Sequence, residues 1–271
     1  KYRTTAVLYP SGGFGRVSEA LAGVVKDRGG EVLTGHRVDR IATEPGPSGG
    51  GFRATGVVVE GNEIKADSVI CTIPVFHLPP LFDDGVIAAH KDFFDRAEEG
   101  SNASSRLALL ICGGRQVLFD KPRNTWVFVP RSQLEEFGEY FLISELDSSQ
   151  GVAPPGKQIL TCATLVEGKA PDLREFRVKM ERELKRLFPK LDLAQADWIT
   201  AQYFPVVDGI ARTIDWYGET RIGPATPVKN FFVAGDTTRE YSTGTDGCAN
   251  SAYLAAGQVL GRTLVRIEDV F

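Results

Sequence analysis

A carboxylate directly follows a short apolar run near the end of the chain. Residues 231–234 read Phe-Phe-Val-Ala, and Gly235 and Asp236 come next. Such a run predicts a fully buried strand, which Gly235 ends because glycine can turn where a Cβ would obstruct the backbone. Asp236 is then expected at the carboxyl end of the strand, where open α/β sheets place their ligands. The pattern therefore predicts a ligand site at the edge of a sheet.

A helix with a small-residue surface follows this carboxylate. Asp246 can cap the helix, and Gly247 opens it. The free N–H groups and the positive dipole end of such a helix favour an electron-rich oxygen or a phosphate. An ordinary strand–loop–helix unit of an α/β domain is the alternative. The helix can lie close to a sheet or a flat ring because its surface carries Ala249, Ala252, Ala255 and Ala256.

These residues resemble the last cofactor-binding segment of the superfamily of FAD-dependent amine oxidases, protoporphyrinogen oxidases and phytoene desaturases. The resemblance implies that Asp236 hydrogen-bonds the ribityl chain of FAD and that backbone N–H groups at the helix start face the flavin pyrimidine edge. Cys248 stands where the family commonly has alanine, and it is small enough to leave room for the ring. The implied cofactor-binding residues of this segment are Gly235, Asp236, Thr245, Gly247, Cys248 and Ala249.

A second stretch near the start of the chain is similar to the same superfamily. Residues 9–13 read Tyr-Pro-Ser-Gly-Gly and precede an amphipathic helix predicted over residues 16–28. Two short strands are predicted next, over residues 31–33 and 37–41. By resemblance, Val38 in the second strand packs against the adenine of FAD. Taken from the residues alone, Val38 is more simply a core residue of a strand.

A third stretch lies between these two. Residues 55–59 and 63–73 are predicted to be paired strands around a Glu60-Gly61-Asn62 turn. Residues 66–74, which end at a proline, resemble the Ala-Asp-x-Val-Ile strand that leads to the cofactor in the superfamily. All three stretches occur in the order that the family would require.

One unit of the superfamily is missing from this sequence. The family begins with a βαβ unit whose GxGxxG loop lets the backbone approach the FAD pyrophosphate. Residues 12–15 read Gly-Gly-Phe-Gly, but the third glycine of the fingerprint would fall on Ser18. The chain therefore resembles the carboxyl-terminal part of a longer protein. A missing N-terminal FAD-binding segment is its expected partner, and the isolated chain is expected to bind FAD weakly or not at all.

The middle of the chain predicts a separate sheet with a covering helix. Asp172 can cap a helix over residues 173–188. The fold class expected is α/β plus α+β: an incomplete, discontinuous, Rossmann-like FAD-binding domain (residues 1–75 and 214–271) with an inserted antiparallel substrate domain (residues 76–213). The strands predicted for the inserted domain cover residues 106–112, 125–130, 139–146, 158–165 and 198–204.

The resemblance implies an FAD-dependent oxidoreductase for the parent protein. A substrate C–H bond next to nitrogen, or in a polyene or porphyrinogen, would lose hydride to the flavin, and the small-molecule substrate would be apolar or an amine. No catalytic residue can be named. The alternative is a non-catalytic fragment or interaction module without bound FAD. The aromatic residues that would line an apolar pocket, or else lie in the core or on the surface, are Tyr203, Phe204, Trp216, Tyr217 and Tyr241.

Composition excludes several other classes. The 271 residues are 42% hydrophobic and carry a net charge of −4 with no basic block, so neither nucleic acid nor an anionic membrane is indicated as a partner. No apolar run approaches the roughly 20 residues of a spanning helix, and a cytoplasmic or membrane-peripheral location is expected. The four cysteines and three histidines lack metal-ligand spacing. Three cysteines lie in strand-like runs and are expected to be buried free thiols, namely Cys71, Cys112 and Cys162.

Overall fold

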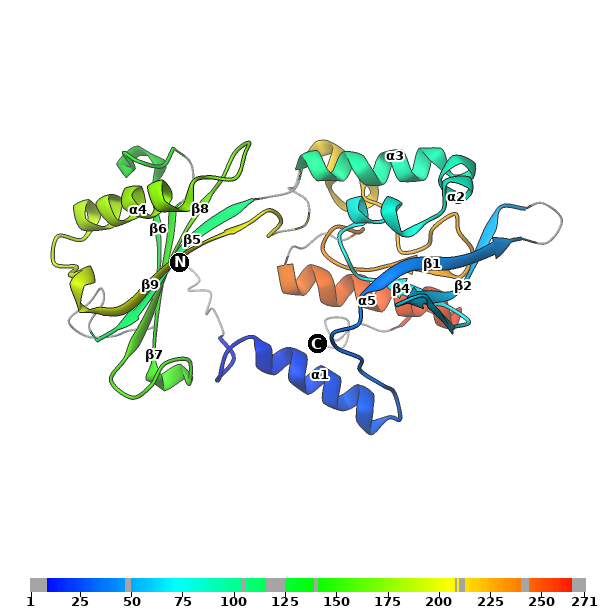
Figure 1. The fold of residues 1–271 in the computed structure, drawn as a ribbon, viewed down its shortest axis with the longest axis horizontal. Coiled ribbons are helices and arrows are strands. Elements are labelled where there is room, and N and C mark those ends of the chain that lie inside the picture. Colours follow the sequence, from blue (N-terminus) through cyan, green and yellow to red (C-terminus); the bar gives the residue numbers. More distant parts are fainter. Residues whose placement is uncertain are drawn as a thin grey trace, which may run out of the picture. The chain divides into compact units, whose positions relative to one another are not determined.

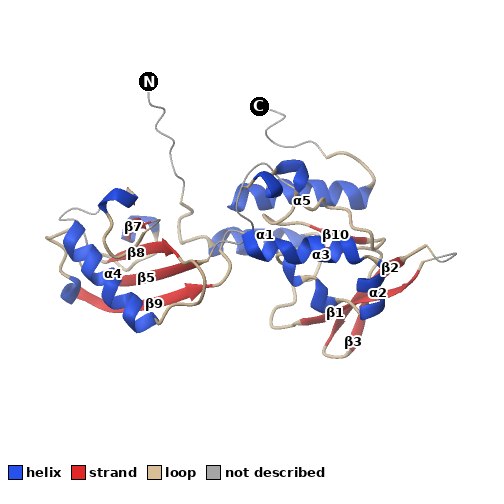
Figure 2. Ribbon diagram, turned by 90° about the horizontal axis from the view of Figure 1, so that it is seen from above, coloured by secondary structure: helices blue, strands red, loops and turns tan. Residues whose placement is uncertain are grey.

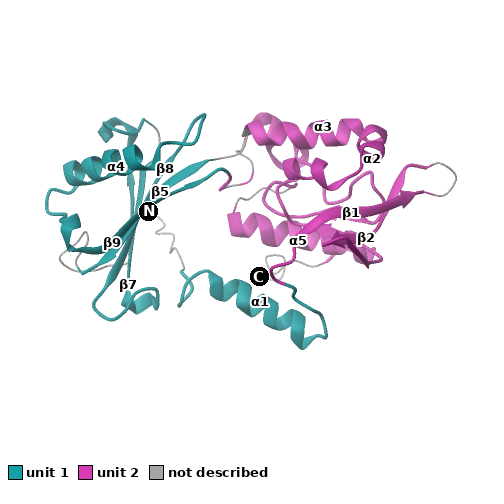
Figure 3. Ribbon diagram, in the orientation of Figure 1, with its two compact units in different colours: residues 1–33, 106–205 teal, residues 34–105, 206–271 magenta. Residues whose placement is uncertain are grey.

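The computed structural model describes residues 9–46, 50–103, 106–115, 125–138, 141–207, 209, 213–239 and 244–264. The chain divides into two compact units, which Figure 3 colours separately. Unit 1 contains residues 1–33 and 106–205, and unit 2 contains residues 34–105 and 206–271. Unit 2 differs from the predicted FAD-binding domain, which comprised residues 1–75 and 214–271. Residues 76–105 group with the strand that precedes Asp236, and residues 1–33 do not.

Unit 1 is built on a five-stranded antiparallel sheet with the order β6-β7-β8-β5-β9. Helix α4 (Leu173–Leu187) lies across one face of this sheet (Figures 1 and 2). The Asp172 carboxylate caps α4 by accepting hydrogen bonds from the N–H groups of Arg174 and Glu175. The predicted antiparallel sheet and covering helix are therefore present. The strands are β5 (Leu107–Gly114), β6 (Thr125–Val129), β7 (Phe141–Asp147), β8 (Gln158–Leu165) and β9 (Ala196–Phe204).

The two faces of this sheet are both apolar. Side chains alternate along a strand, so Leu110 and Cys162 face α4 together with its buried Met180 and Leu184. The register places a second set of large apolar side chains on the opposite face, with no cover from α4. This set contains Trp126, Phe128, Leu142, Leu146, Ile159, Leu107, Leu109, Ile111, Trp198 and Phe204.

Helix α1 (Gly15–Asp27) confirms the predicted amphipathic helix to within a residue at each end, yet none of its residues is buried. The main-chain hydrogen bond from Gly12 N–H to Gln150 O, 2.7 Å long, joins the segment before α1 to the rest of unit 1. The apolar stripe of α1 remains largely exposed, as at Leu21 and Val24. Residues 31–33 are exposed and form no strand, contrary to prediction, because no neighbouring strand pairs with them in the described part of the chain.

Unit 2 contains two sheets over one core. The strands β1 (Val38–Pro45), β2 (Phe52–Val59) and β3 (Asn62–Lys65) form an antiparallel meander. The predicted turn is present between β2 and β3, where Glu60 and Gly61 both have positive φ. Strand β4 (Val69–Cys71) pairs in parallel with β10 (Phe231–Val233). The predicted strand over residues 63–73 is thus wrong as one element: Ala66 N–H still bonds to Thr55 O, whereas Val69 N–H bonds to Asn230 O, so the chain changes sheets between them.

The described helices of unit 2 lie beside β10 or contribute to its core. They are α2 (Asp84–Ala89), α3 (Lys91–Glu99) and α5 (Gly244–Leu260), and Figure 2 shows α5 beside β10. Phe82, just before α2, contacts Phe231 of β10 edge to face at 5.0 Å between ring centroids, and Phe94 of α3 at 5.2 Å. These contacts explain why residues 76–105 belong to unit 2.

Strands β1 and β10 share one core, to which Ile41 and Phe231 both contribute, although they lie in different sheets. In the described residues the parallel sheet consists of β4 and β10 alone. No helix in the described ranges has both the length and the apolar composition to cross a bilayer. Short 3₁₀ turns occupy Val75–His77, Pro79–Leu81, Gly100–Ala103, Arg131–Gln133, Ser148–Gln150, Leu193–Gln195, Ile214–Trp216 and Gly218–Thr220.

Candidate functional site

The carboxyl ends of β4 and β10 lie side by side and define the candidate site. Ala234 N–H donates to Cys71 O at 3.0 Å, so the segments that leave the two strands start together. Gly235 has φ +126, a conformation that L side chains rarely adopt, and a Cβ there would lie 3.5 Å from Thr72 O. The predicted need for glycine at this turn is therefore explained by backbone conformation. The ends of parallel strands are also where open α/β sheets bind ligands.

The turn after β10 is fixed from two sides by buried hydroxyl groups. Gly235 N–H donates to Ser251 Oγ of α5 at 2.7 Å, and Ser251 Oγ donates to Cys248 O at 2.9 Å. Val75 N–H, which follows β4, donates to Thr237 Oγ1 at 3.2 Å. Both hydroxyl-bearing residues are almost fully buried. Sequence reasoning missed Ser251 and Thr237, although a serine within an alanine-rich helix face is a visible signal.

The half-buried Asp236 carboxylate already holds one backbone donor. Gly209 N–H donates to Asp236 Oδ2 at 2.8 Å. A Cβ on Gly209 would lie 2.5 Å from Asp236 Oδ1, so only glycine permits this approach. A carboxylate offers about four acceptor sites, so one backbone donor leaves room for hydroxyl groups of a ligand. The residues present therefore fit the ribityl chain that the resemblance implies, while Asp236 also has a structural role.

Cys248 lies next to this carboxylate. Partial burial, and then the negative charge of Asp236, raise the pKa of the Cys248 thiol above its ordinary value. The thiol is therefore neutral near pH 7. Cys248 lies in α5, and its main-chain carbonyl accepts a hydrogen bond from Ser251 Oγ.

The start of α5 differs from the prediction. The helix begins at Gly244, so Asp246 lies in its first turn and does not cap it. Local turn signals misplaced the start because the helix already includes Gly244, whose φ is +63, and Thr245 before Asp246. Gly247 is buried, whereas Thr245, Cys248 and Ala249 are exposed. The first turn therefore presents its surface to solvent beside Asp236.

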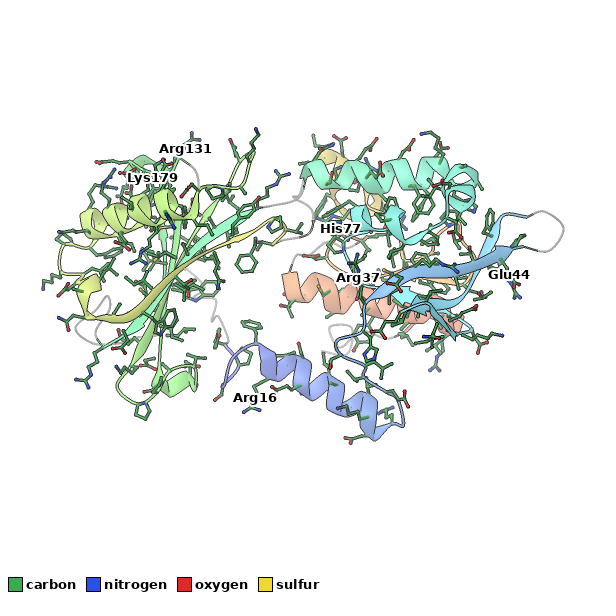
Figure 4. The ribbon with its side chains drawn as sticks, viewed as in Figure 1. Arg16, Arg37, Glu44, His77, Arg131 and Lys179 are labelled. Carbon is green, nitrogen blue, oxygen red and sulfur yellow. The ribbon has the colours of Figure 1, made fainter. Side chains whose placement is uncertain are left out.

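Val38 lines a cavity of about 690 Å³ on the other side of β4. Ile41 and Val57 line it from β1 and β2, and residues 69–74 line it from β4 and its continuation. Arg37 and His77, both labelled in Figure 4, contribute a guanidinium and an imidazole to its lining. The cavity is otherwise mainly apolar. Val38 also packs against the core of unit 2, as the simpler interpretation expects.

Two of the predicted site residues, Val38 and Gly235, lie near the end of β4 from different sides. Val38 shares a cavity with Thr72, and Gly235 adjoins the carbonyl of the same residue from the β10 side. Asp236 and Cys248 lie together at the β10 end.

The aromatic residues singled out from the sequence are divided between the two units. Trp216 is buried in the core of unit 2, where the Arg96 guanidinium lies 3.6 Å from its ring centroid. Tyr203 packs against the core of unit 1, and Phe204 and Tyr217 are exposed. Tyr241 lies outside the described residues.

The cysteines carry no metal site within the described ranges. Cys112 and Cys162 are buried free thiols as predicted, while Cys71 is only partly buried, because it lines the cavity next to β4. Burial raises the pKa of Cys112 to about 12 and also raises the pKa of Cys71.

Comparison with known proteins gives a consistent result. The sequence profile of a family described as flavin containing amine oxidoreductase matches residues 2–260. No curated protein matches the chain. The structure is similar to an oxidoreductase from Methanosarcina mazei, with a TM-score of 0.65 and 20% identity over 93% of this chain and 55% of that one.

Two further solved structures are similar in fold. One is a putative protoporphyrinogen oxidase from Exiguobacterium, with a TM-score of 0.62 and 14% identity over 92% of this chain and 51% of that one. The other is Rab GDI from Plasmodium falciparum, with a TM-score of 0.53 and 16% identity over 95% of this chain and 47% of that one. The chain thus spans about half the length of the solved structures that it resembles.

Proposed function

We propose, since the chain belongs to the family of flavin containing amine oxidoreductases, that the protein is an FAD-dependent oxidoreductase acting on an apolar or amine substrate. The observation that carries this proposal is the parallel β4–β10 pair, whose adjacent ends present Gly235 and Asp236 beside the start of α5. Bound FAD would supply the two-electron acceptor for a substrate C–H bond. The protein's own residues bind and orient the cofactor as parts of a discontinuous, Rossmann-like domain.

Each predicted site residue has a proposed role in that binding. Asp236 accepts a hydrogen bond from a ribityl hydroxyl. Gly235 lets the cofactor approach the main chain of this turn more closely than a Cβ would permit. Val38 packs against the adenine. The resemblance implies that backbone N–H groups of Thr245, Gly247, Cys248 and Ala249 face the flavin pyrimidine edge. Because α5 begins at Gly244, the N–H groups of Cys248 and Ala249 bond within the helix, so the free donor among these residues is Thr245 in the first turn.

The apolar nature of the substrate is supported by unit 1. The face of its sheet that α4 does not cover carries large apolar side chains, and Phe128 and Trp198 are substantially exposed there. Large exposed apolar side chains on one face of a sheet often mark a binding site. We propose that this face contributes to substrate binding, which agrees with the predicted role of the inserted domain.

The direct test is the colour and redox chemistry of the full-length protein. A yellow preparation that loses its flavin absorption anaerobically with an amine, a porphyrinogen or a polyene supports the proposal. A colourless protein that FAD cannot reconstitute would instead support a non-catalytic interaction module.

The role of Asp236 has its own test. A charge-assisted hydrogen bond is worth roughly 1.5–3 kcal/mol, so Asp236→Ala in the full-length protein should weaken FAD binding about ten- to a hundredfold. The melting temperature should also fall, because Gly209 N–H loses its acceptor. Asp236→Asn is the matched control, since its amide oxygen can still accept from Gly209 while the charge is lost. Unchanged FAD affinity in Asp236→Ala would leave Asp236 with a structural role alone.

We further propose that a segment outside residues 1–271, carrying a pyrophosphate-binding βαβ unit, is the partner of this chain. Two observations support it: the chain spans about half the length of its structural relatives, and β4 has an open edge. Val69 and Cys71 direct their peptide groups to β10, so those of Ile70 face the other edge. In the described residues no strand pairs there, and the mainly apolar cavity adjoins it.

A charge placed on this edge tests the partner proposal. Ile70 is 43% exposed on β4, and Ile64 is 45% exposed on β3 in the other sheet, so the two isoleucines form a matched pair. Ile70→Lys should abolish association with a separately expressed segment that contains the βαβ unit, whereas Ile64→Lys should leave association unchanged. Calorimetry measures both. Equal effects of the two variants would place the contact elsewhere.

FAD binding by the separate parts completes this experiment. The isolated chain is expected to bind FAD weakly or not at all in calorimetric titration, because the pyrophosphate contacts belong to the partner segment. Tight stoichiometric binding by residues 1–271 alone would contradict that expectation.

A further inference from the structure

A buried arginine reaches the main chain of the candidate site. Arg221 is only 2% exposed, and its guanidinium donates hydrogen bonds to backbone carbonyls, among them those of Trp216 and Asp236. Nε donates to Trp216 O at 3.0 Å, and Nη1 donates to Asp236 O at 2.7 Å. Burying a guanidinium is costly unless its donors are used, so these two bonds are central to its position. One planar group therefore ties the site turn to the corner at residue 216.

The corner at residue 216 is itself firmly held. Arg96 of α3 stacks on the Trp216 ring and also donates to the carbonyl groups of Asp215 and Thr220. The chain then runs beside β10, where Val233 N–H bonds to Pro224 O at 2.9 Å and Arg239 N–H bonds to Ile222 O at 2.7 Å. Arg221 thus links the turn after β10 to a well-supported part of unit 2.

The hydrogen bond from Arg221 to Asp236 O restricts the orientation of the Asp236 carboxylate. The carbonyl and the side chain leave the same residue, so fixing the peptide plane after Cα limits the directions open to Cβ. Gly209 N–H then holds the carboxylate from the other end. A planar guanidinium can serve two carbonyl groups at fixed angles, which a lysine ammonium on a flexible stem cannot reproduce.

We propose that Arg221 is a positioning residue, which holds the Asp236 main chain so that the carboxylate is already oriented for a ribityl hydroxyl before the cofactor binds. The inference rests on the proposed role of Asp236. Preorganisation of this kind improves affinity because less order has to be created on binding.

The test compares three arginine variants of the full-length protein by two measurements, the FAD dissociation constant from calorimetry and the melting temperature of the apoprotein. Arg221→Met should weaken FAD binding by about tenfold, which corresponds to about 1.4 kcal/mol. Arg221→Lys should bind FAD more tightly than Arg221→Met but less tightly than the unmodified protein. It replaces Arg221→Met in the test if that variant does not fold. Arg96→Met is the matched control, because Arg96 supports the same corner without reaching Asp236. It should lower the melting temperature and leave FAD affinity unchanged.

A double-mutant cycle separates this inference from the proposed function. If Arg221 acts through Asp236, Arg221→Met should have little further effect on FAD affinity in the Asp236→Ala background. If the effects of the two substitutions on FAD affinity are additive, the inference is wrong, while the proposed role of Asp236 is unaffected. Normal FAD affinity in the single variant Arg221→Met would have the same meaning. An Asp236→Ala variant with normal affinity would overturn both.

Discussion

The five-stranded sheet of unit 1 and the β4–β10 pair of unit 2 are assembled in different ways. In unit 1, β7 and β8 are neighbours in sequence and pair antiparallel, and α4 covers the face where Leu110 and Cys162 lie. In unit 2, two three-residue strands from distant parts of the chain pair in parallel. The Val75–Thr237 hydrogen bond beside them joins residues 162 positions apart.

This difference explains where the candidate site lies. Antiparallel strands that are neighbours in sequence, such as β6, β7 and β8, can complete their hydrogen bonds with each other, whereas a parallel pair needs a crossover connection and leaves its strand ends free. The free ends of β4 and β10 are held by single groups, such as Ser251 and Thr237, instead of by a ladder. The region that depends on such isolated bonds is also the one that can present Asp236 to a ligand.

Deleting a core ring in each unit should give the largest effects and should separate the units. Phe231 and Phe141 are both fully buried, and each contacts another aromatic ring. Phe→Ala at such positions costs about 3–5 kcal/mol. Phe231→Ala should remove hydrogen-exchange protection in unit 2 and leave unit 1 protected, with the reverse for Phe141→Ala. Loss of protection in both units from either variant would show that the two regions unfold together.

A methyl group added to a glycine should sharpen the comparison at the turns. Gly235 has φ +126 and a near neighbour in Thr72 O, while Gly156 in unit 1 has φ +73 and nothing within 4 Å of an added Cβ. Strained backbone of this kind costs about 1–3 kcal/mol. The loss of unfolding free energy, measured by urea denaturation, should be near the top of that range for Gly235→Ala and near the bottom for Gly156→Ala. The reverse order would mean that the site turn tolerates a side chain.

Loss of a single hydroxyl should affect the site more than the sheet. Ser251→Ala leaves the Gly235 N–H without its acceptor, which costs about 1–3 kcal/mol for a buried donor. In unit 1, the Ser144 hydroxyl donates to Thr161 O at 3.5 Å, the limit of a hydrogen bond, so Ser144→Ala should cost less than about 0.5 kcal/mol. Chemical denaturation of both variants tests this. If Ser251→Ala and Ser144→Ala lose the same unfolding free energy, isolated hydrogen bonds are not what stabilises the site.

The smallest effect concerns the thiols. Burial raises the pKa of Cys112 to about 12, and burial with the nearby Asp236 charge raises the pKa of Cys248. A raised pKa means less thiolate at a given pH, so alkylation of Cys248 should be slow at pH 8 and should increase as the pH rises above 9. Cys112 should not react while unit 1 is folded. Asp236→Asn should lower the pKa of Cys248 and speed its alkylation, which mass spectrometry can follow.

The sequence predicted the helices, strands and turns of both regions better than the contacts between distant segments. The apolar run before Gly235, the helix capped by Asp172 and the Glu60-Gly61 turn depend on neighbouring residues, so the sequence was sufficient for them. The change of sheet between Ala66 and Val69 was not predictable, because an apolar run does not say which strand will pair with it. Gly209 and Arg221 escaped notice for the same reason: their significance comes from Asp236, which is distant in sequence.

The placement of the three tryptophans makes the two regions distinguishable by their fluorescence. Trp126 and Trp198 lie in unit 1 with substantial exposure, so their emission should be red-shifted, whereas the buried Trp216 of unit 2 should emit at shorter wavelength. The Arg96 cation lies over the Trp216 ring and adds a charge next to this chromophore. The short-wavelength part of the emission therefore reports on the segment that carries Arg221, without any label having to be introduced.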